Sequence, residues 1–342
     1  FIIESNVSGT GVWRRVEVPF AGATTDDISG GDFFTDEKVN SAFTGGGDIT
    51  YSKNKTSGYN ISGASFTGDS LPAFDYAEDV AFNDTGSKLF VASWDIGPFN
   101  SGPIREYELS TNFDITTATF NNQISRLDLF TLGITFEDDG KKLFAAGNNG
   151  DEIIRAELST AFDLSSKGSE QSFDVSSQTT TPLAVDFNSD GTKMFVLCTN
   201  EIYEYNLSTG FDLTTASYSG NSSSFGGDNF AFNDDGDEII TVERGIVEKY
   251  SLTNSFDITT VDSLEASFDA SSEVGSSTKG LTFGDGGRVM LISNTSQATD
   301  SIFSYNTDFS DNTEKPASTA EFTLDVSSLS ASDLFGSKTT DD

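Results

Sequence analysis

Two short phrases recur along this chain, and this internal repeat limits the fold more than any other feature of the sequence. The first phrase reads AFNDTGSKLFV from Ala81 and DFNSDGTKMFV from Asp186. The second follows it and reads EYELSTNFDITT from Glu106 and EYNLSTGFDLTT from Glu204. Every copy of the first phrase has a Phe four residues before a Gly, with the Phe at positions 82, 136, 187, 232 and 283. The chain therefore contains five copies of one structural unit.

Each repeat reads as four short strands joined by tight turns. In the clearest copy, LAVDF (183–187) and TKMFVLC (192–198) are apolar strands joined by NSDG, whose Gly can adopt a positive φ. EIYEYNL (201–207) alternates polar and apolar residues, which predicts a strand with one buried face. Asp212 suits an Asx turn before a last strand near Ser217. Four antiparallel strands in one repeat are typical of a β-propeller blade.

The repeats predict an all-β fold, a six-bladed β-propeller with seven blades as the alternative. A single blade cannot bury both faces of its sheet, whereas a closed ring of blades buries them and protects the strand edges. We expect the Phe of each F-x-x-x-G to end the innermost strand and the Phe of each LSTxFD to pack between blades. YNISGASF (59–66) matches FDITTATF (113–120), and LFGS (334–337) resembles TFGD (282–285). We therefore expect a sixth blade shared by residues of about 32–68 and 320–337, which closes the ring.

Residues 1–30 lie outside the repeats, and residues 31–342 are assigned to the propeller. VWRRVEV (12–18) alternates, and it places Trp13 beside Arg14 and Arg15 in an otherwise acidic chain. Two interpretations stay open for these three residues. They belong to an edge strand packed on the propeller, or to a docking strand that attaches the protein to a partner subunit.

The charge of the chain excludes several classes of function. It has 19 Lys and Arg against 54 Asp and Glu, a formal net charge of −35. Nucleic-acid binding requires clustered basic residues, and an anionic membrane surface would repel this chain. We expect neither a nucleic-acid partner nor membrane insertion. Such a charge keeps a surface hydrated and suits a saline habitat, where ions screen self-repulsion.

Catalysis is not expected from the residue types that are present. The chain has no His and one Cys, Cys198, so a Ser-His-Asp or Cys-His mechanism and a thiolate zinc site are excluded. A pair of carboxyl groups for glycoside cleavage is not excluded by sequence. We expect Cys198, at the end of a strand, to be a small buried residue.

The segment QSFDVSSQTTTPLAVDFNSDGTKMFVLCTNEIYEYNLSTGFDLTTASY (171–218) resembles a tandem repeat family of marine bacteria and their phages. Its units have the form SFDVS, a Pro, F-x-x-DG-KMFV and EYxLSTxxDIST. The resemblance covers about 32–337. It departs from the pattern in the fifth repeat, where LSTxFD has become NTDFS (306–310). The family is similar to β-propellers, and many members are virion or cell-surface proteins without a known activity.

The resemblance implies a non-enzymatic virion surface protein of a phage or virus from a marine or saline habitat. It would act as a structural, decoration or host-attachment module of a tail or capsid fibre, present in many copies. Its partners would be other virion or surface proteins and a host glycan or receptor. One alternative is a bacterial or archaeal cell-surface or extracellular structural protein. A second is a propeller hydrolase or lyase.

Two groups of residues are candidates for binding. Asp234, Asp235 and Asp237 in NDDGDE (233–238) resemble part of a calcium loop but lack the spacing and the closing Glu of a twelve-residue site. A hairpin turn with solvated carboxylates is the favoured interpretation, and no cofactor is expected beyond incidental calcium. Trp94 and Phe99 lie in SWDIGPFNSGP (93–103), the longest insertion between a second and a third strand. They are candidates for glycan or protein contact, with local packing as the alternative.

Overall fold

The computed structural model of the chain contains two compact units, one of residues 57–314 and one of residues 1–56 with 315–342. In the larger unit the described residues are 59–72, 76–93, 102–125, 127, 131–137, 139–147, 150–199, 201–222, 227–295 and 301–307. In the smaller unit the description is limited to the backbone of the strands β1 (Ile2–Asn6), β2 (Trp13–Glu17), β3 (Ile49–Ser52) and β24 (Glu321–Leu324). β1 pairs with β2, and β24 pairs with β3, in both cases antiparallel.

Four sheets of the larger unit are each made from four consecutive antiparallel strands. The first contains β5 (Ala77–Phe82), β6 (Lys88–Ser93), β7 (Ile104–Leu109) and β8 (Ala118–Ile124). The second contains β9 (Thr131–Phe136), β10 (Lys142–Gly147), β11 (Glu152–Leu158) and β12 (Lys167–Asp174). The third contains β13 (Ala184–Phe187), β14 (Lys193–Leu197), β15 (Ile202–Leu207) and β16 (Ala216–Ser222). The fourth contains β17 (Asn229–Phe232), β18 (Glu238–Glu243), β19 (Ile246–Leu252) and β20 (Val261–Asp269).

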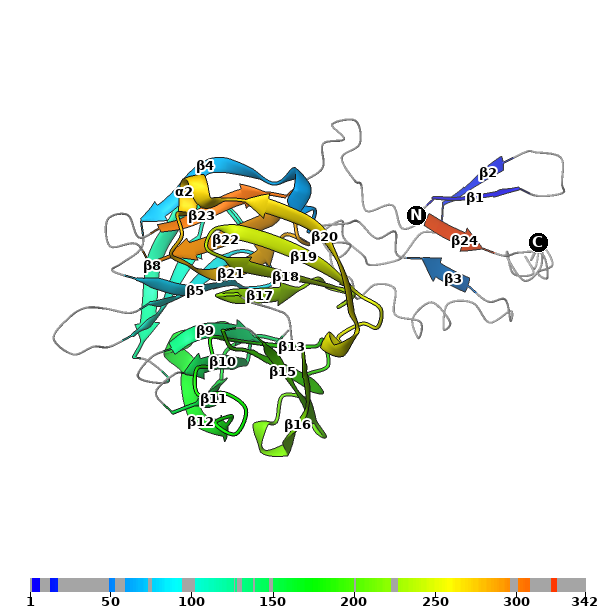
Figure 1. Cartoon of the computed structure of the whole chain (residues 1–342). Helices are drawn as coiled ribbons and strands as arrows, with labels where there is room; N and C mark the ends of the chain where they lie inside the picture. Colours follow the sequence, from blue (N-terminus) through cyan, green and yellow to red (C-terminus); the bar gives the residue numbers. More distant parts are fainter. Residues whose placement is uncertain are drawn as a thin grey trace, which may run out of the picture. The chain divides into compact units, whose positions relative to one another are not determined.

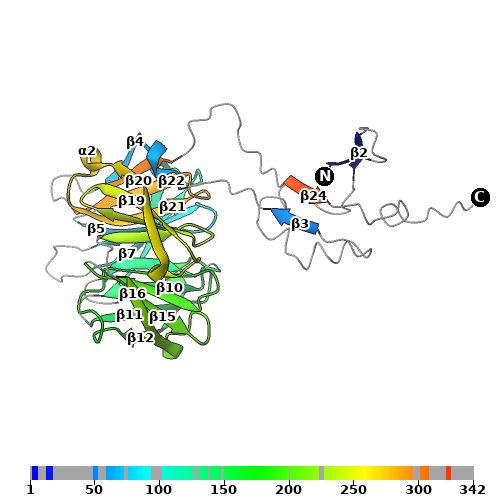
Figure 2. The same cartoon turned by 45° about the vertical axis from the view of Figure 1, so that its right-hand side comes forward.

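The fifth sheet takes its strands from both ends of the larger unit. Three are consecutive, β21 (Thr278–Gly284), β22 (Val289–Asn294) and β23 (Ser301–Asn306), and the fourth is β4 (Ser65–Pro72). β4 runs antiparallel to β23, with Ser65 opposite Asn306 and Ser70 opposite Phe303. The ring is therefore closed by hydrogen bonds between strands that are more than 200 residues apart in the chain. The described residues of the larger unit form an all-β propeller of five blades, which Figures 1 and 2 show in two views. In Figure 1 each first strand lies near the centre and each fourth strand lies outside.

The prediction of six or seven blades is wrong, and the reason lies in the fifth repeat. The match between YNISGASF (59–66) and a fourth-strand phrase is confirmed, because β4 is a fourth strand. In the fifth repeat the phrase before the fourth strand has become NTDFS (306–310). β4 supplies the missing fourth strand of that repeat and does not start a sixth blade. β24, near the C-terminus, pairs with β3 and belongs to none of the five blades.

The hydrophobic core is divided into five clusters, each built by two neighbouring blades. One cluster joins Phe90 of the first blade to Ile134 and Leu164 of the second. The others join the second blade to the third, the third to the fourth, the fourth to the fifth, and the fifth back to the first. The second strands are buried along almost their whole length, because a sheet covered on both faces requires a continuous apolar strand. The fourth strands are largely exposed and correspondingly polar.

The Phe of each LSTxFD phrase packs on the Gly of the first turn of its own blade. It also contacts the neighbouring blade, which confirms the predicted position between blades. Phe211 has a φ of 60° and Gly191 a φ of 68°. The Phe211 N–H donates to the Gly191 carbonyl at 3.0 Å, and its ring lies against Phe187 and Phe144, with centroids 5.3 and 6.0 Å away. Phe144 belongs to the preceding blade. Tyr59 takes the same place in the fifth blade, with a φ of 65° and an N–H···O bond of 2.9 Å to Gly287.

An aspartate fixes the turn that follows each of these Phe residues. Asp212 accepts a hydrogen bond from the Thr214 N–H at 3.1 Å and caps a short 3₁₀ helix, which confirms the Asx turn expected there. The equivalent 3₁₀ helices are η4 (Ile115–Thr117), η5 (Leu164–Ser166), η6 (Leu213–Thr215) and η7 (Ile258–Thr260), with η3 (Ile61–Gly63) before β4 and one helical turn, α2 (Ser271–Val274), after β20. In the part of the chain that the structure describes, no helix has the length and apolarity needed to cross a membrane.

In three blades a lysine or arginine side chain forms a hydrogen bond with the next blade, at the carbonyl of the Phe in its LSTxFD phrase. Lys88 donates to the carbonyl of Phe162 at 2.9 Å, and Lys193 to that of Phe256 at 2.7 Å. Each lysine also pairs with a buried glutamate of its own blade, at 2.7 Å for Glu106 and 3.0 Å for Glu204. In the second blade, Arg155 makes the equivalent bond to the Phe211 carbonyl at 2.7 Å.

Replacement of Gly191 by Ala tests the packing of the Phe residues on the first turn. A Cβ at Gly191 would overlap the Phe211 ring, whereas a Cβ at Gly286, also at positive φ (63°), meets no heavy atom within 4 Å. We expect Gly191→Ala to lower the free energy of unfolding by about 3 kcal/mol or more, and Gly286→Ala by about 1 kcal/mol, the cost of backbone strain alone. Denaturant unfolding of both variants measures the difference, and equal losses would contradict this packing.

Candidate functional site

The centre of the propeller contains a cavity of about 200 Å³ lined by the first strands of all five blades. Residues alternate between the two faces of a strand, so positions one and three before each repeat Phe share a face. The residues one position before the Phe are Ala81, Thr135, Asp186, Ala231 and Thr282. The residues three positions before are Asp79, Gly133, Ala184, Asn229 and Gly280. The repeat supplies the walls of the cavity, and these variable positions supply Asp79, Thr135, Asp186, Asn229 and Thr282 to its lining.

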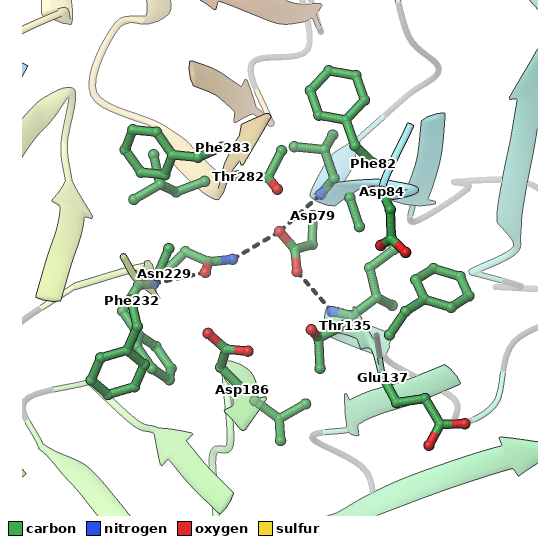
Figure 3. Close-up of a pocket in the computed structure, with 18 of the residues that line it drawn as sticks. Asp79, Phe82, Asp84, Thr135, Glu137, Asp186, Asn229, Phe232, Thr282 and Phe283 are labelled. Atoms are coloured by element: carbon green, nitrogen blue, oxygen red, sulfur yellow. Dashed lines mark hydrogen bonds between the residues drawn. The ribbon is translucent and has the colours of Figure 1, made fainter. Parts of the chain in front are cut away.

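Asp79 connects three blades through its carboxyl group. Oδ2 accepts a hydrogen bond from the Ile134 N–H of the second blade at 2.7 Å. Oδ1 accepts from the Val80 N–H of its own blade and from Asn229 Nδ2 of the fourth blade, both at 2.8 Å. Asp79 and Asn229 are each only 3 % exposed. Figure 3 shows this arrangement, with Asp186 reaching toward the same space from the third blade.

Glycines on the second and fifth blades allow the inner strands to approach each other closely. A Cβ at Gly280 of the fifth blade would lie 2.7 Å from both the Asp79 Cα and its Oδ1, so a side chain there would displace Asp79. At Gly133 of the second blade a Cβ would lie 2.6 Å from the Ala184 Cα of the third. Asp79 and Asn229, which are hydrogen-bonded to each other, are the large side chains at this level of the inner strands.

Burial dominates the electrostatics of Asp79. Burial raises the pKa of Asp79 above the usual range of a carboxyl group, and the nearby Asp186 raises it further. The hydrogen bonds from Ile134, Val80 and Asn229 favour the ionised form and lower the pKa, but less strongly. The site thus combines the buried carboxyl group of Asp79 with the partly exposed one of Asp186.

The chemistry open to the cavity follows from these groups. Two carboxyl groups, two Thr hydroxyls and an amide are oxygen ligands of the kind that Ca²⁺ prefers, although Ca²⁺ takes six to eight of them. Acid–base catalysis by a pair of carboxyl groups requires a substrate to reach both. Asp79 is almost completely buried, and both of its oxygens accept hydrogen bonds from the protein. Its position fits a group that holds blades together.

Glu137 also lines the cavity, but Figure 3 shows its carboxyl group pointing away from Asp79 and Asp186. It forms an ion pair with Lys142, and its burial raises its pKa. Within the described residues, no group of three or more acidic, Cys or His side chains is placed to hold a metal ion.

The three aspartates proposed for incidental calcium lie at the first turn of the fourth blade. Asp234 and Asp235 are exposed in the turn that Gly236 closes with an N–H···O bond of 2.9 Å to Asn233. Asp234 accepts a hydrogen bond from the Tyr59 hydroxyl at 2.8 Å, and Asp237 accepts one from Asn233 Nδ2 at 2.7 Å. The structure therefore places them in a hairpin turn that contacts the closing segment, and calcium binding there stays a prediction.

The other candidates lie at the margins of the described chain. Trp13, Arg14 and Arg15 belong to β2, which pairs with β1 in the smaller unit, and the description covers their backbone only. Trp94 and Phe99 fall outside the described residues. Cys198 follows β14 and is partly exposed, more than expected for a buried residue.

Asp79, Asp186 and Asn229 are not among the site residues predicted from the sequence. The signal was present, because these residues stand where other repeats have Gly, Ala or Thr on the same face of the first strand. A search for polar residues that interrupt the repeat, instead of those that define it, would have identified them.

Comparisons with known proteins add little to this description. No family model matches the chain, and no curated protein matches it. Among solved structures, the chain is similar to a functionally unknown protein from Desulfotomaculum acetoxidans DSM 771, with 15 % identity and a TM-score of 0.38. The match covers 66 % of this chain and 70 % of that one. It gives no information on function.

Replacement of Asp79 by Asn tests whether this carboxyl group joins the blades. Asn has one acceptor oxygen, so its NH₂ group would face either Ile134 N–H or the donors of Val80 and Asn229. We expect Asp79→Asn to cost about 1–3 kcal/mol in the free energy of unfolding, although the two side chains have the same shape. Asp186→Asn is the matched control and should cost less, since its Oδ1 can still accept from the Phe187 N–H. An Asp79→Asn variant as stable as the wild type would refute the role.

The pKa of Asp79 also predicts a dependence on pH. Because burial raises the pKa of Asp79 in the folded state, the folded protein binds a proton more tightly than the unfolded chain does. The stability of the wild type relative to Asp79→Asn should therefore be greatest below the ordinary Asp pKa of about 4 and should fall as the pH rises from there toward the raised value. Unfolding of both proteins at several pH values gives this difference. A difference that grows with pH would contradict the raised pKa.

Proposed function

We propose that this protein is a non-enzymatic display module on the outer surface of a virion from a saline habitat. In this role the propeller is a rigid platform that contacts a host surface or neighbouring virion proteins. The smaller unit, which contains residues 1–30, attaches the propeller to the particle. The protein acts in many copies, so that weak contacts add up.

The observation that carries this proposal is the position of the two ends of the propeller. Tyr59, the first described residue of the larger unit, donates its N–H to the Gly287 carbonyl at 2.9 Å. Thr307, the last described residue, donates its N–H to the carbonyl of Arg288, the residue after Gly287, at 2.9 Å. Both ends of the propeller are therefore held by one turn of the fifth blade. A platform connected at one place can present its other four blades to a partner.

The central cavity and the charge support the same interpretation. Asp79 and Asn229 are engaged with backbone and side-chain groups of several blades, as expected for a structural role. A net charge of −35 keeps the surface hydrated, and the ions of a saline medium screen the repulsion within the chain. Neither observation requires a cofactor or a substrate.

Immuno-electron microscopy of the source material tests the proposal. An antibody against the propeller should label the outside of virus particles, and particles assembled with a chain that lacks residues 1–30 should lose the label. Circular dichroism and thermal unfolding of the shortened chain must first show a folded propeller. Label on cell envelopes without particles would contradict the virion assignment and favour a cell-surface protein. Label confined to the cell interior would contradict any display role.

A further inference from the structure

Four large apolar side chains are exposed among the described residues, and all four occupy the same place in their blades. Phe66, Phe120, Tyr218 and Leu264 are 37 %, 53 %, 46 % and 51 % exposed. Each lies on a fourth strand and pairs with a tyrosine of the third strand, namely Tyr305, Tyr107, Tyr205 and Tyr250. Single exposed apolar residues are common on protein surfaces. A repeated position on the rim of the propeller requires a separate explanation.

The fourth strands of the first and third blades differ from the rest in charge. β8 reads ATFNNQI and β16 reads ASYSGNS, so neither has an ionisable acid or base apart from the Tyr218 phenol. The other three fourth strands each carry at least one carboxylate, such as Asp69, Glu170 and Glu265. In a chain with 54 acidic residues, two strands with aromatic, amide and hydroxyl side chains are neutral strips on an anionic surface.

The two exposed aromatic rings are held in place by the rings beneath them. Phe120 packs edge-on against Tyr107, with centroids 5.9 Å apart. Tyr218 lies 5.8 Å from Tyr205 and 6.3 Å from Tyr203, and its hydroxyl donates to Asn221 Oδ1 at 3.1 Å. A ring fixed in this way loses little conformational entropy when a ligand packs on it.

The structure disfavours a peptide strand or a second copy as the partner. Both strips have a register shift next to the aromatic residue, between Glu106 and Tyr107 and between Glu204 and Tyr205. Such bulges bend an edge strand and hinder the addition of another strand. A second copy that paired through its own outer strand would meet the same bulges, and neither strip offers a Lys or Arg to an acidic partner.

We propose that the outer strands β8 and β16 bind neutral glycans, with Phe120 and Tyr218 as the residues on which sugar rings pack. The apolar face of a pyranose ring covers the exposed aromatic ring, and its hydroxyl groups bond to neighbouring amides and hydroxyls. Exposed amides lie on the same strands, Gln123 on β8 and Asn221 on β16, and Asn221 is the residue that the Tyr218 hydroxyl contacts. Each site is weak alone, and several sites on several copies provide the affinity. This inference rests on the proposed display function and names the partner.

Binding of purified full-length protein to mannan, dextran and galactan, with alginate as the anionic comparison, tests the inference. Affinity electrophoresis in gels that contain each polysaccharide measures the retardation of the protein. At least one neutral polymer should retard the wild type, and alginate should not. Phe120→Ala and Tyr218→Ala should each weaken binding about three- to tenfold, and the double variant should weaken it further.

Two variants serve as controls for fold and for chemistry. Leu264→Ala removes an equally exposed apolar side chain from a charged strand and should leave binding unchanged, while Tyr218→Phe should retain most of it. Circular dichroism and thermal unfolding confirm that each variant is folded. Binding to alginate alone, binding unaffected by the double variant, or no binding to any neutral polymer would overturn the inference. Such a result would refute glycan binding but not the display function, because antibody labelling of virus particles would be unaffected. Antibody label inside cells, together with normal glycan binding, would refute the display function alone.

Discussion

The packing of one aromatic ring on one glycine, repeated in every blade, determines most of this structure. In four blades the ring follows the third strand, and in the fifth it is Tyr59, which precedes the fourth strand. In every blade the glycine closes the turn between the first two strands, so the contact fixes the shape of the blade. The outer face of the ring also touches the preceding blade, as Phe211 does with Phe144. The carbonyl of the same residue accepts a hydrogen bond from a cation of that blade in three cases. Local turn geometry and the stacking of neighbouring blades are thus coupled at a single residue.

A ring of five blades brings the inner strands close together, and this explains the unusual residues at the centre. Gly280 leaves room for Asp79, Gly133 lets the second blade approach Ala184 of the third, and Asp79 and Asn229 are bonded to each other between the strands. A buried carboxyl group is costly unless it is hydrogen-bonded. The backbone N–H groups of Val80 and Ile134 and the side-chain amide of Asn229 donate these hydrogen bonds to Asp79. The centre is therefore polar, and its buried carboxyl group is held by hydrogen bonds from several blades.

Much of the blade could be predicted from sequence because its determinants are local and repeated. The hairpin glycines, the Asx turn at Asp212 and the Phe between blades follow from short patterns with known geometry. The blade number could not be obtained in the same way, because it depends on which incomplete repeat the segment 59–72 completes. The decayed phrase NTDFS (306–310) held that information, but the similarity of the C-terminus to other repeats favoured a different pairing. Asp79 escaped prediction because it departs from the repeat.

A cross-link between the two strands that close the ring tests the central claim, a five-bladed ring completed by β4. In a Cys198→Ser background, cysteines at Ser65 and Asn306, which face each other across β4 and β23, should join on mild oxidation. The resulting loop of more than 200 residues would change the mobility of the denatured chain in gel electrophoresis. In a ring of six blades β4 would belong to a separate blade, and this pair would stay reduced. A folded protein in which the two cysteines do not join would contradict the five-bladed closure.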